Sequence, residues 1–151
     1  MKVRAAQEED FGTITRLLEQ LGRPTVTLRS RTECKEIFSE QLADPNTEHL
    51  VAVTDRDTIV GFCALHFRSR LNQPDPQAWI PDLIVDDARK GRGVARLLLA
   101  AVEERARERG CFEIAVESAS YVRNEADLLY TGAGMADAGR SFRKALDGGF
   151  G

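Results

Sequence analysis

The sequence predicts a mixed α/β domain in which an antiparallel meander of strands is followed by a β-α-β unit. Segments with helical apolar spacing alternate with short strand-like segments, in the expected order βααβββαβαβ. A link of three residues, Asp55-Arg56-Asp57, joins two of the strand-like segments and indicates an antiparallel hairpin. The 151 residues suit a single domain, expected over 1–146, with a flexible tail at 147–151.

The first part of the chain is expected to hold a short strand, Lys2 to Ala5, and two helices. The apolar stripe of the first helix consists of Phe11, Ile14, Leu17, Leu18 and Leu21. The second helix is expected to begin near Ser30, which forms a capping-box pattern with Glu33, and to end at Asp44-Pro45. Its expected inner face consists of Ile37, Phe38, Gln41 and Leu42.

Three strands are expected in the middle of the chain. The first two, Leu50 to Thr54 and Thr58 to Arg68, form the hairpin. The second of them is apolar on both faces, which predicts a central strand covered by helices on each side. A Pro-rich loop from Asn72 to Gln77 leads into the third strand, Trp79 to Val85.

The remaining elements follow a glycine-bearing loop. A helix from about Val94 to Arg109 is stopped by Gly110, and a strand from Phe112 to Glu117 alternates between apolar and polar residues. A short helix is expected from about Asn124 to Thr131, and a last extended segment from about Ala136 to Ala145.

Composition narrows the classes of function. The net charge is −3 and basic residues are scattered among acidic ones, which argues against nucleic-acid binding. No segment is apolar for long enough to span a membrane and the N-terminus does not resemble a signal peptide, so a cytoplasmic protein is expected. The three cysteines and two histidines lack ligand spacing, so we expect core packing and no metal.

The loop before the predicted long helix has the features of a phosphate site. Gly91 and Gly93 allow a tight turn and close approach of a ligand. The N–H groups of residues 92–96 lie at the start of a helix, where they have no intrahelical partner and sit at the positive end of the helix dipole. The nearby cations are Arg89, Lys90, Arg92 and Arg96. Amide donors and cations in one place suit a pyrophosphate, although a solvated basic loop would have the same composition.

Two other phosphate loops fit poorly. A Walker A loop needs Gly-Lys-Ser/Thr after its glycines, which is missing here. A Rossmann fingerprint needs a third Gly or Ala where this chain has Arg96, and it belongs to the first βα turn of a parallel sheet.

Two blocks of sequence resemble the GNAT family of N-acetyltransferases. Lys90-Gly-Arg-Gly93-Val-Ala95 resembles the family's Gln/Arg-x-x-Gly-x-Gly/Ala loop, and Ala126-x-x-Leu129-Tyr130-x-x-x-Gly134-Met135 is similar to its Ala-x-x-Phe-Tyr-x-x-x-Gly-Phe block. The order of elements also looks like that fold over nearly the whole chain. Three positions depart from the family pattern: Lys90, Asp127 and Met135.

The resemblance implies a GNAT-like fold, with a mixed, mostly antiparallel sheet, helices on both faces and a V-shaped opening between the fourth and fifth strands. Pro81 supports a bulge there, because proline removes one ladder hydrogen bond, although an edge strand would also tolerate it. Acetyl-CoA would then be the co-substrate. The implied coenzyme-binding residues are Leu83, Ile84, Val85, Lys90, Gly91, Arg92, Gly93, Val94, Ala95, Arg96 and Asn124, although Asn124 fits a helix N-cap equally well.

Acetyl transfer to an amine needs an oxyanion donor, a base and an acid. A backbone N–H near Leu83 or Ile84 suits the first need. Asp82 is the candidate base, acting directly or through water, and Tyr130 is the candidate acid that the resemblance places beside the sulfur. Each also has a plain structural explanation, as an outward polar residue and a core tyrosine. His66 is expected to pack at the rim of the core.

The expected acceptor is a primary amine on a small molecule, attacked directly without an acyl-enzyme. Arginines that would suit a carboxylate or phosphonate on this acceptor are Arg23, Arg29, Arg31, Arg68 and Arg70. The stretches Cys63 to Arg70 and Trp79 to Val85 look similar to aminoalkylphosphonate acetyltransferases, and aminoglycoside acetyltransferases share much of the plan. The alternatives are an acyl-CoA sensor without turnover, an acetyltransferase for a protein or peptide amine, and a nucleotide-binding domain. Relatives are often dimers, so a homodimer is possible.

Overall fold

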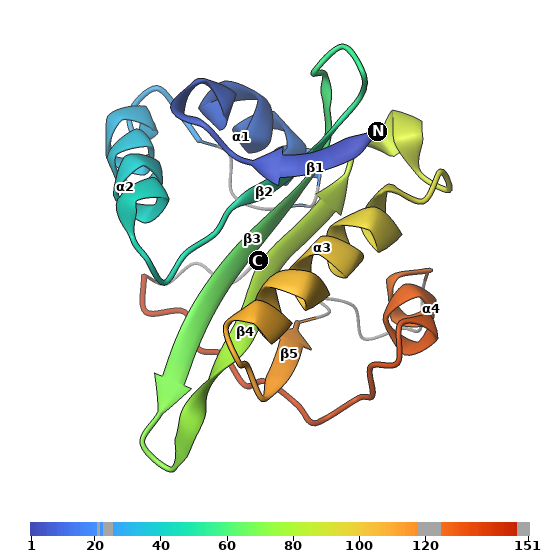
Figure 1. The fold of residues 1–151 in the computed structure, drawn as a ribbon. Helices are drawn as coiled ribbons and strands as arrows, with labels where there is room; N and C mark the ends of the chain where they lie inside the picture. The colour runs from blue at the N-terminus through green and yellow to red at the C-terminus, as the bar shows by residue number, and fades with distance from the viewer. Residues whose placement is uncertain (21, 23–25, 118–124, 148–151) are drawn as a thin grey trace. The chain divides into compact units, whose positions relative to one another are not determined.

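The structure is a computed structural model that describes residues 1–20, 22, 26–117 and 125–147 (Figure 1). Contacts divide the chain into two compact units, Met1–Ala119 and Ser120–Gly151, and we describe each by itself. The expected single domain over 1–146 stays a prediction. Residues 148–151 of the expected tail lie outside the described residues.

The first unit is built on a five-stranded sheet in the order β1-β2-β3-β4-β5. Its strands are β1 (Lys2–Ala5), β2 (Leu50–Val53), β3 (Ile59–Arg70), β4 (Gln73–Val85) and β5 (Glu113–Val116). The strands β1 to β4 pair antiparallel with one another, and β5 pairs parallel with β4. This confirms the predicted mixed sheet, with a meander followed by a crossover.

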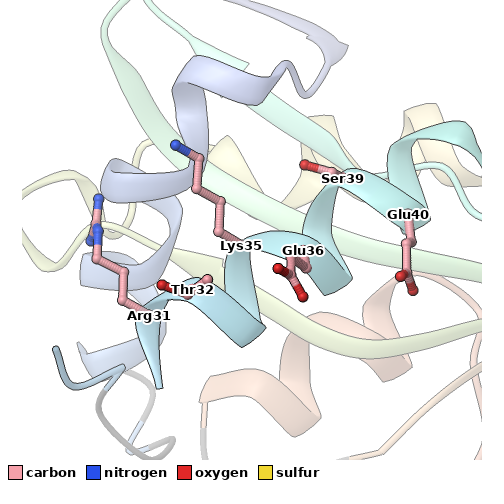
Figure 2. A pocket seen from close by; sticks show the side chains of 6 residues that line it. All are labelled: Arg31, Thr32, Lys35, Glu36, Ser39 and Glu40. Carbon is pink, nitrogen blue, oxygen red and sulfur yellow. The ribbon is translucent and has the colours of Figure 1, made fainter. Parts of the chain in front are cut away.

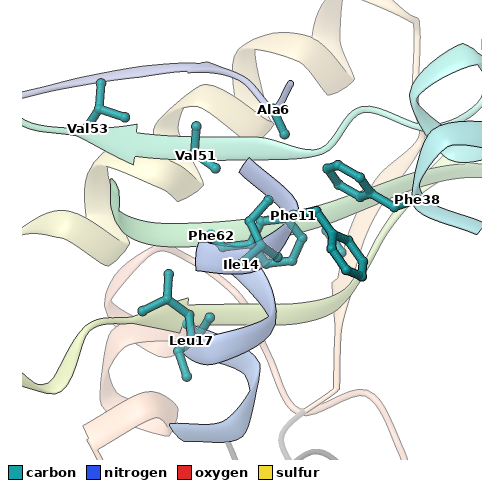
Figure 3. Close-up of a cluster of buried hydrophobic side chains, with 10 residues drawn as sticks. Ala6, Phe11, Ile14, Leu17, Phe38, Val51, Val53 and Phe62 are labelled. Atoms are coloured by element: carbon teal, nitrogen blue, oxygen red, sulfur yellow. The ribbon is translucent and has the colours of Figure 1, made fainter. Parts of the chain in front are cut away.

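Helices cover both faces of this sheet. The helices α1 (Phe11–Gln20) and α2 (Arg31–Ala43) cover one face, and α3 (Val94–Glu108) packs on the other. Figure 3 shows the apolar cluster under α1 and α2, where Phe11 and Phe38 lie over Phe62 of β3. On the opposite face, a Cβ at Gly61 would lie 2.8 Å from Val94 Cγ1, so α3 sits directly on the β3 backbone. This close packing fixes where the loop before α3 lies.

The start of α2 differs from the prediction. Ser30 is its N-cap residue but makes no side-chain cap hydrogen bond, because its Oγ accepts the N–H of Thr27 at 3.1 Å. A reciprocal capping box forms instead at the 3-10 turn Glu8–Asp10, where Asp10 Oδ2 accepts the N–H of Gln7 at 2.8 Å. Ile37, expected on the inner face of α2, is 52% exposed.

The expected Pro-rich loop is also wrong, because residues 73–77 belong to β4. Arg70 pairs with Gln73 and Arg68 pairs with Gln77, which makes β3 and β4 a long hairpin. The side chains add to this pairing, since Arg68 Nε donates to Gln77 Oε1 at 2.6 Å. Prolines are tolerated at strand ends that need few ladder hydrogen bonds, so the composition alone suggested a loop.

The second unit contains α4 (Glu125–Gly132), which ends in a Schellman motif. The N–H of Met135 donates to the carbonyl of Tyr130 at 3.0 Å, and the N–H of Gly134 donates to that of Thr131 at 3.1 Å. Gly134 adopts a φ of 85°, which explains a glycine four residues after the tyrosine. The expected strand from Ala136 to Ala145 does not form in this unit, because a strand needs a neighbouring edge for its hydrogen bonds.

The buried ion pair of Arg4 and Asp10 allows a test of stability. Asp10 is 8% exposed, and its carboxylate accepts from Arg4 Nη1 at 2.8 Å and from the N–H of Gln7. We expect Asp10→Ala to lower the free energy of unfolding by about 2–3 kcal/mol, because both donors lose their acceptor. Asp10→Asn, which keeps an acceptor for Gln7, is expected to cost less. Urea unfolding of the three proteins measures this difference.

The pH dependence of that difference has a defined sign. The hydrogen bond from Arg4 lowers the pKa of Asp10 below its usual value. A depressed carboxyl pKa stabilises the folded state above the unfolded pKa, and the contribution is lost as pH falls through the folded pKa. The stability gap between wild type and Asp10→Asn is therefore expected to close on acidification. A gap that stays constant down to about pH 2 would contradict a role for the ionised carboxylate.

Candidate active site

The described pairing of β4 with β5 ends before β4 does. Pairing runs from Gln77 with Glu113 to Ile80 with Val116, and β4 then continues to Val85 beside β3 alone within the described residues. This is the opening that was expected between the fourth and fifth strands. Within the described part of the chain, residues 83–85 have a strand partner on the β3 side only.

A bulge at Ile80-Pro81 begins this opening. His66 pairs with Trp79 and Ala64 pairs with Asp82, so β4 takes three steps where β3 takes two. This agrees with the bulge that Pro81 predicted. Residues three apart normally face opposite sides of a strand, but the extra residue brings Trp79 and Asp82 to the same face of the sheet.

The direction of the backbone amides along β4 follows from the register. The N–H of Asp86 donates to the carbonyl of Val60 at 2.9 Å. Antiparallel pairs alternate between hydrogen-bonded and non-bonded residues, so Ile84 also bonds to β3, whereas Leu83 and Val85 direct their amides away from β3. Of the two expected oxyanion donors, this geometry favours Leu83. Ile84 instead contributes a buried side chain to the core.

The loop between β4 and α3 has the turns that the sequence predicted. Gly91 and Gly93 adopt φ values of 81° and 80°, and a Cβ on either would meet no atom within 4 Å. The first hydrogen bond of α3 runs from the N–H of Leu97 to the carbonyl of Gly93 at 3.0 Å. The preceding helical N–H groups, those of Val94, Ala95 and Arg96, therefore lack an intrahelical acceptor.

Charge around this loop is mostly exposed. Arg92 and Arg96 are exposed, and Lys90 Nζ lies 2.9 Å from Asp87 Oδ1, so part of its charge is balanced. Open space at the glycines, amides without an intrahelical acceptor and exposed cations together fit the pyrophosphate of a coenzyme. Residues 90–96 are the ones that would hold the pyrophosphate.

On the face covered by α1 and α2, aromatic rings form a continuous row. Ring centroids are 5.9 Å apart for Phe38 and His49, 5.7 Å for His49 and His66, and 5.6 Å for His66 and Trp79. The guanidinium of Arg68 lies 4.3 Å from the Trp79 ring. The row ends at Trp79, which lies in β4 just before the bulge and Asp82.

Two buried polar atoms in this row, His49 Nδ1 and Trp79 Nε1, have no hydrogen-bond partner among the described residues. His49 is only 6% exposed, and its other nitrogen, Nε2, lies 2.6 Å from Gln41 Oε1. Buried polar atoms without partners are uncommon and usually meet water or a ligand. The row therefore combines an apolar surface with two buried polar atoms that have no partner in the described part of the protein.

Burial controls the titration of this region. Burial lowers the pKa of His49 to about 4, and it also lowers the pKa of His66 below its usual value. Asp82 acts in the opposite direction on both imidazoles, which shows that its charge reaches them. Burial also raises the pKa of the Cys63 thiol to about 12, so this cysteine is a poor nucleophile.

The remaining expected site residues belong to the C-terminal part. Tyr130 lies in α4 of the second unit and is half-buried there. Asn124 lies outside the described residues, as does the segment 118–123 before it. Among the described residues there is no cluster of three side chains that suits a metal ion, and no helix long and apolar enough to cross a membrane.

Two hollows on the surface lie away from these residues. One of about 620 Å³ follows α2 (Figure 2) and is lined by Arg31, Thr32, Lys35, Glu36, Ser39 and Glu40. Another of about 560 Å³ is lined by Asn46, Phe67, Ser69, Pro76 and Arg109. Neither contains an expected catalytic or coenzyme-binding residue. We place the candidate site at the strand opening, because the backbone donors and the turns of the loop meet there.

Parallel pairing that ends before β4 does, followed by a glycine-bearing turn at the start of α3, is the arrangement expected of an acetyltransferase fold. The sequence matches the model of the Acetyltransferase (GNAT) family over residues 14–132, which is more than half of the chain. The chain belongs to the GNAT family of acetyltransferases.

Similar proteins agree with this assignment. An aminoalkylphosphonate N-acetyltransferase of Salmonella typhimurium is 27% identical over 145 residues, which cover 96% of this chain and 91% of that protein. A putative acetyltransferase from Agrobacterium tumefaciens has a TM-score of 0.83 at 23% identity, covering 97% of this chain and 100% of the other. An aminoglycoside N-acetyltransferase in complex with CoA has a TM-score of 0.74 at 21% identity, covering 96% and 100%. The two structures show the shared fold.

Sequence reasoning missed the row of rings. His66 was expected to pack at the rim of the core, and no role was assigned to His49 or Trp79. The spacing of Phe62, Ala64 and His66, two residues apart along β3, indicated only that these three side chains share one face of the sheet. The bulge concealed the rest, since without it Trp79 and Asp82 would face opposite sides.

Proposed function

We propose that this protein is an N-acetyltransferase that moves the acetyl group of acetyl-CoA to a primary amine of a small molecule. The observation that carries this proposal is the opening beside β4, where the N–H of Leu83 points away from β3 just before the loop whose helix-start amides lack an intrahelical acceptor. Membership of the GNAT family supports the reaction type. We expect the enzyme to act in the cytoplasm.

Each group has a proposed role. Residues 90–96 hold the pyrophosphate, and the outward amides of Leu83 and Val85 bond to the pantetheine arm. The Leu83 N–H also stabilises the negative charge that develops on the thioester oxygen. Asp82 binds the acceptor ammonium and acts as the base that begins to remove its proton, directly or through water. Tyr130 protonates the leaving thiolate, because the pKa of a phenol is closer to that of a thiol than the pKa of a carboxyl is.

Direct attack of the amine on the thioester is favoured over an acyl-enzyme. Cys63 is fully buried and its raised pKa keeps it protonated at neutral pH. Cys34 and Cys111 are partly buried, and burial also raises the pKa of Cys111. A thiol acyl carrier needs an accessible thiolate, which these environments disfavour.

We further propose that the acceptor carries a phosphonate or carboxylate. Arg68 lies over Trp79, the residue that pairs with His66 just before the bulge, and its Nε is fixed by Gln77. An anion beside Arg68 would gain charge-assisted hydrogen bonds, and the buried Trp79 Nε1 is a further donor in the same region. The likeness to an aminoalkylphosphonate N-acetyltransferase supports this acceptor class.

A thiol-release assay tests the proposed function. Acetyl-CoA is offered with an aminoalkylphosphonate, an amino acid, an aminoglycoside and a lysine peptide. We expect turnover with the first two and little with the polycationic aminoglycoside. Tight acetyl-CoA binding without turnover on any amine would favour the sensor, and turnover on the peptide alone would favour a protein substrate. Stabilisation by NAD or ATP but not by coenzyme A would indicate a nucleotide-binding domain.

A further inference from the structure

His66 occupies a central place in the row of rings. It is half-buried on β3, between His49 and Trp79, and its backbone forms an isolated bridge with Thr47. Its neighbour two residues back along the strand, Ala64, pairs with Asp82. The imidazole therefore lies on the same face of the sheet as the candidate acceptor-binding carboxylate.

The hydroxyl of Thr47 lies between His66 and an acidic side chain. Thr47 Oγ1 is 3.5 Å from Asp44 Oδ2, to which it donates, and 3.4 Å from His66 Nδ1. We assign the proton of the neutral ring to Nδ1, because a hydroxyl has a single hydrogen and the one that donates to Asp44 accepts from the ring. Both distances are long, as catalytic hydrogen bonds often are before substrate binds.

The other nitrogen, Nε2, then has an available lone pair. Within the described residues no group donates a hydrogen bond to it, and the residue is half-buried. An imidazole that carries its proton on Nδ1 and has a lone pair on Nε2 has the arrangement of a general base.

We propose that Nε2 of His66 takes the proton of the acceptor ammonium, while Asp82 holds that ammonium and stabilises the imidazolium that forms. The proposal rests on the proposed acetyl transfer and adds the destination of the proton. Imidazole has an ordinary pKa of about 6.5 against about 4 for a carboxyl, so it is the stronger base of the two classes. Thr47 and Asp44 position the imidazole ring. The proton on Nδ1 points toward Thr47, whose hydroxyl in turn donates to the exposed Asp44.

The charges around His66 agree with this role. Asp44, at the end of α2, and Asp82, on β4, both favour the imidazolium, whereas Arg68 on β3 opposes it. Burial is the largest effect and lowers the pKa of His66 below its usual value, so the ring is neutral and ready to accept a proton at neutral pH. His49, with a pKa of about 4, stays neutral beside it.

The proton balance is complete. The ammonium gives one proton to Nε2, and the free amine attacks the carbonyl carbon as the C–N bond forms. The C–S bond then breaks, and the thiolate takes the phenol proton of Tyr130. The phenolate recovers a proton from the nitrogen of the new amide. One net proton remains on His66 and leaves to solvent.

The test is the pH profile of kcat/KM for His66→Gln with an acceptor that the wild type acetylates. The wild-type value is expected to level off above the pKa of His66 and to fall tenfold per pH unit below it. For the variant we expect a loss of about 100-fold near neutral pH and a steady rise with pH, because only amine that is already neutral reacts.

Three measurements separate this role from a structural one. His49→Gln removes a neighbouring imidazole of the row and is expected to keep the wild-type acid limb. Thr47→Val is expected to lower kcat/KM by about tenfold and Thr47→Ser to restore it. Nitrogen-15 NMR of wild-type His66 should show a proton on Nδ1 and none on Nε2. All variants should keep the acetyl-CoA affinity of the wild type.

The outcomes are distinguishable. An active wild type whose pH profile is unchanged in His66→Gln would overturn this inference alone, as would a His66 protonated at Nε2 at neutral pH. A wild type that acetylates no amine, despite binding acetyl-CoA, would overturn the proposed function itself.

Discussion

Gly93→Glu is expected to weaken acetyl-CoA binding by about 100-fold or more, equivalent to about 2.7 kcal/mol. Gly93 is the N-cap of α3 and has a φ of 80°, a conformation that costs a residue with a side chain about 1 kcal/mol or more. The new carboxylate would also stand where the pyrophosphate is proposed to lie, and like charges at close range repel strongly. Isothermal titration with acetyl-CoA measures the loss.

The chain offers a matched control for this substitution. Gly110, just beyond the other end of α3, has a φ of 68° and equally open space at its Cβ. Gly110→Glu therefore brings the same charge and a similar backbone strain, but far along the helix from the loop. We expect it to retain acetyl-CoA affinity. Equal losses in the two variants, or no loss in Gly93→Glu, would show that the loop is not the coenzyme site.

Tyr130→Phe is expected to lower turnover by about 100-fold on the true acceptor while acetyl-CoA affinity stays the same. The substitution removes the proposed proton donor to the thiolate and leaves the ring. The backbone of α4 should be unaffected, because the Schellman motif uses the Tyr130 carbonyl and the positive φ of Gly134. Stopped-flow detection of the released thiol measures the rate.

A further substitution checks that the hydroxyl is responsible. Thr131, the next residue in α4, donates its hydroxyl to the carbonyl of Asp127 at 2.9 Å. Thr131→Val removes a hydroxyl from the same turn without touching the proposed acid, so turnover should stay near that of the wild type. Full turnover in Tyr130→Phe would exclude Tyr130 as the acid.

Much of the fold could be predicted because its signals are local. The helical spacing from Phe11 to Leu17 and the short link at residues 55–57 depend on neighbours a few positions apart. The glycines of the loop also act locally, and both adopt the positive φ that their position required. Pro81 pointed to the bulge because a proline inside a sheet removes one ladder hydrogen bond, although an edge strand would also have tolerated it.

Predictions that depended on partners were less successful. Ser30 was expected to cap α2, but its hydroxyl bonds to Thr27 instead. Residues 73–77 were taken for a loop because prolines usually interrupt strands, yet a long hairpin accommodates them. The strand expected near Phe142 depended on an edge to join, and a sequence pattern does not show whether one is available.

Some features of the candidate site follow from local sequence, and others depend on how the strands pair. The sequence alone predicted the class of fold and the turns of the loop before α3, because these belong to short motifs with local signals. It also named Asp82 and Tyr130 as candidate groups, and their roles stay predictions. Only the tertiary structure decided that Leu83 rather than Ile84 directs its amide away from β3, since amide direction depends on register across β3 and β4. Only the bulge brings Asp82 to the face of His66, because it changes the side on which every later residue of the strand lies.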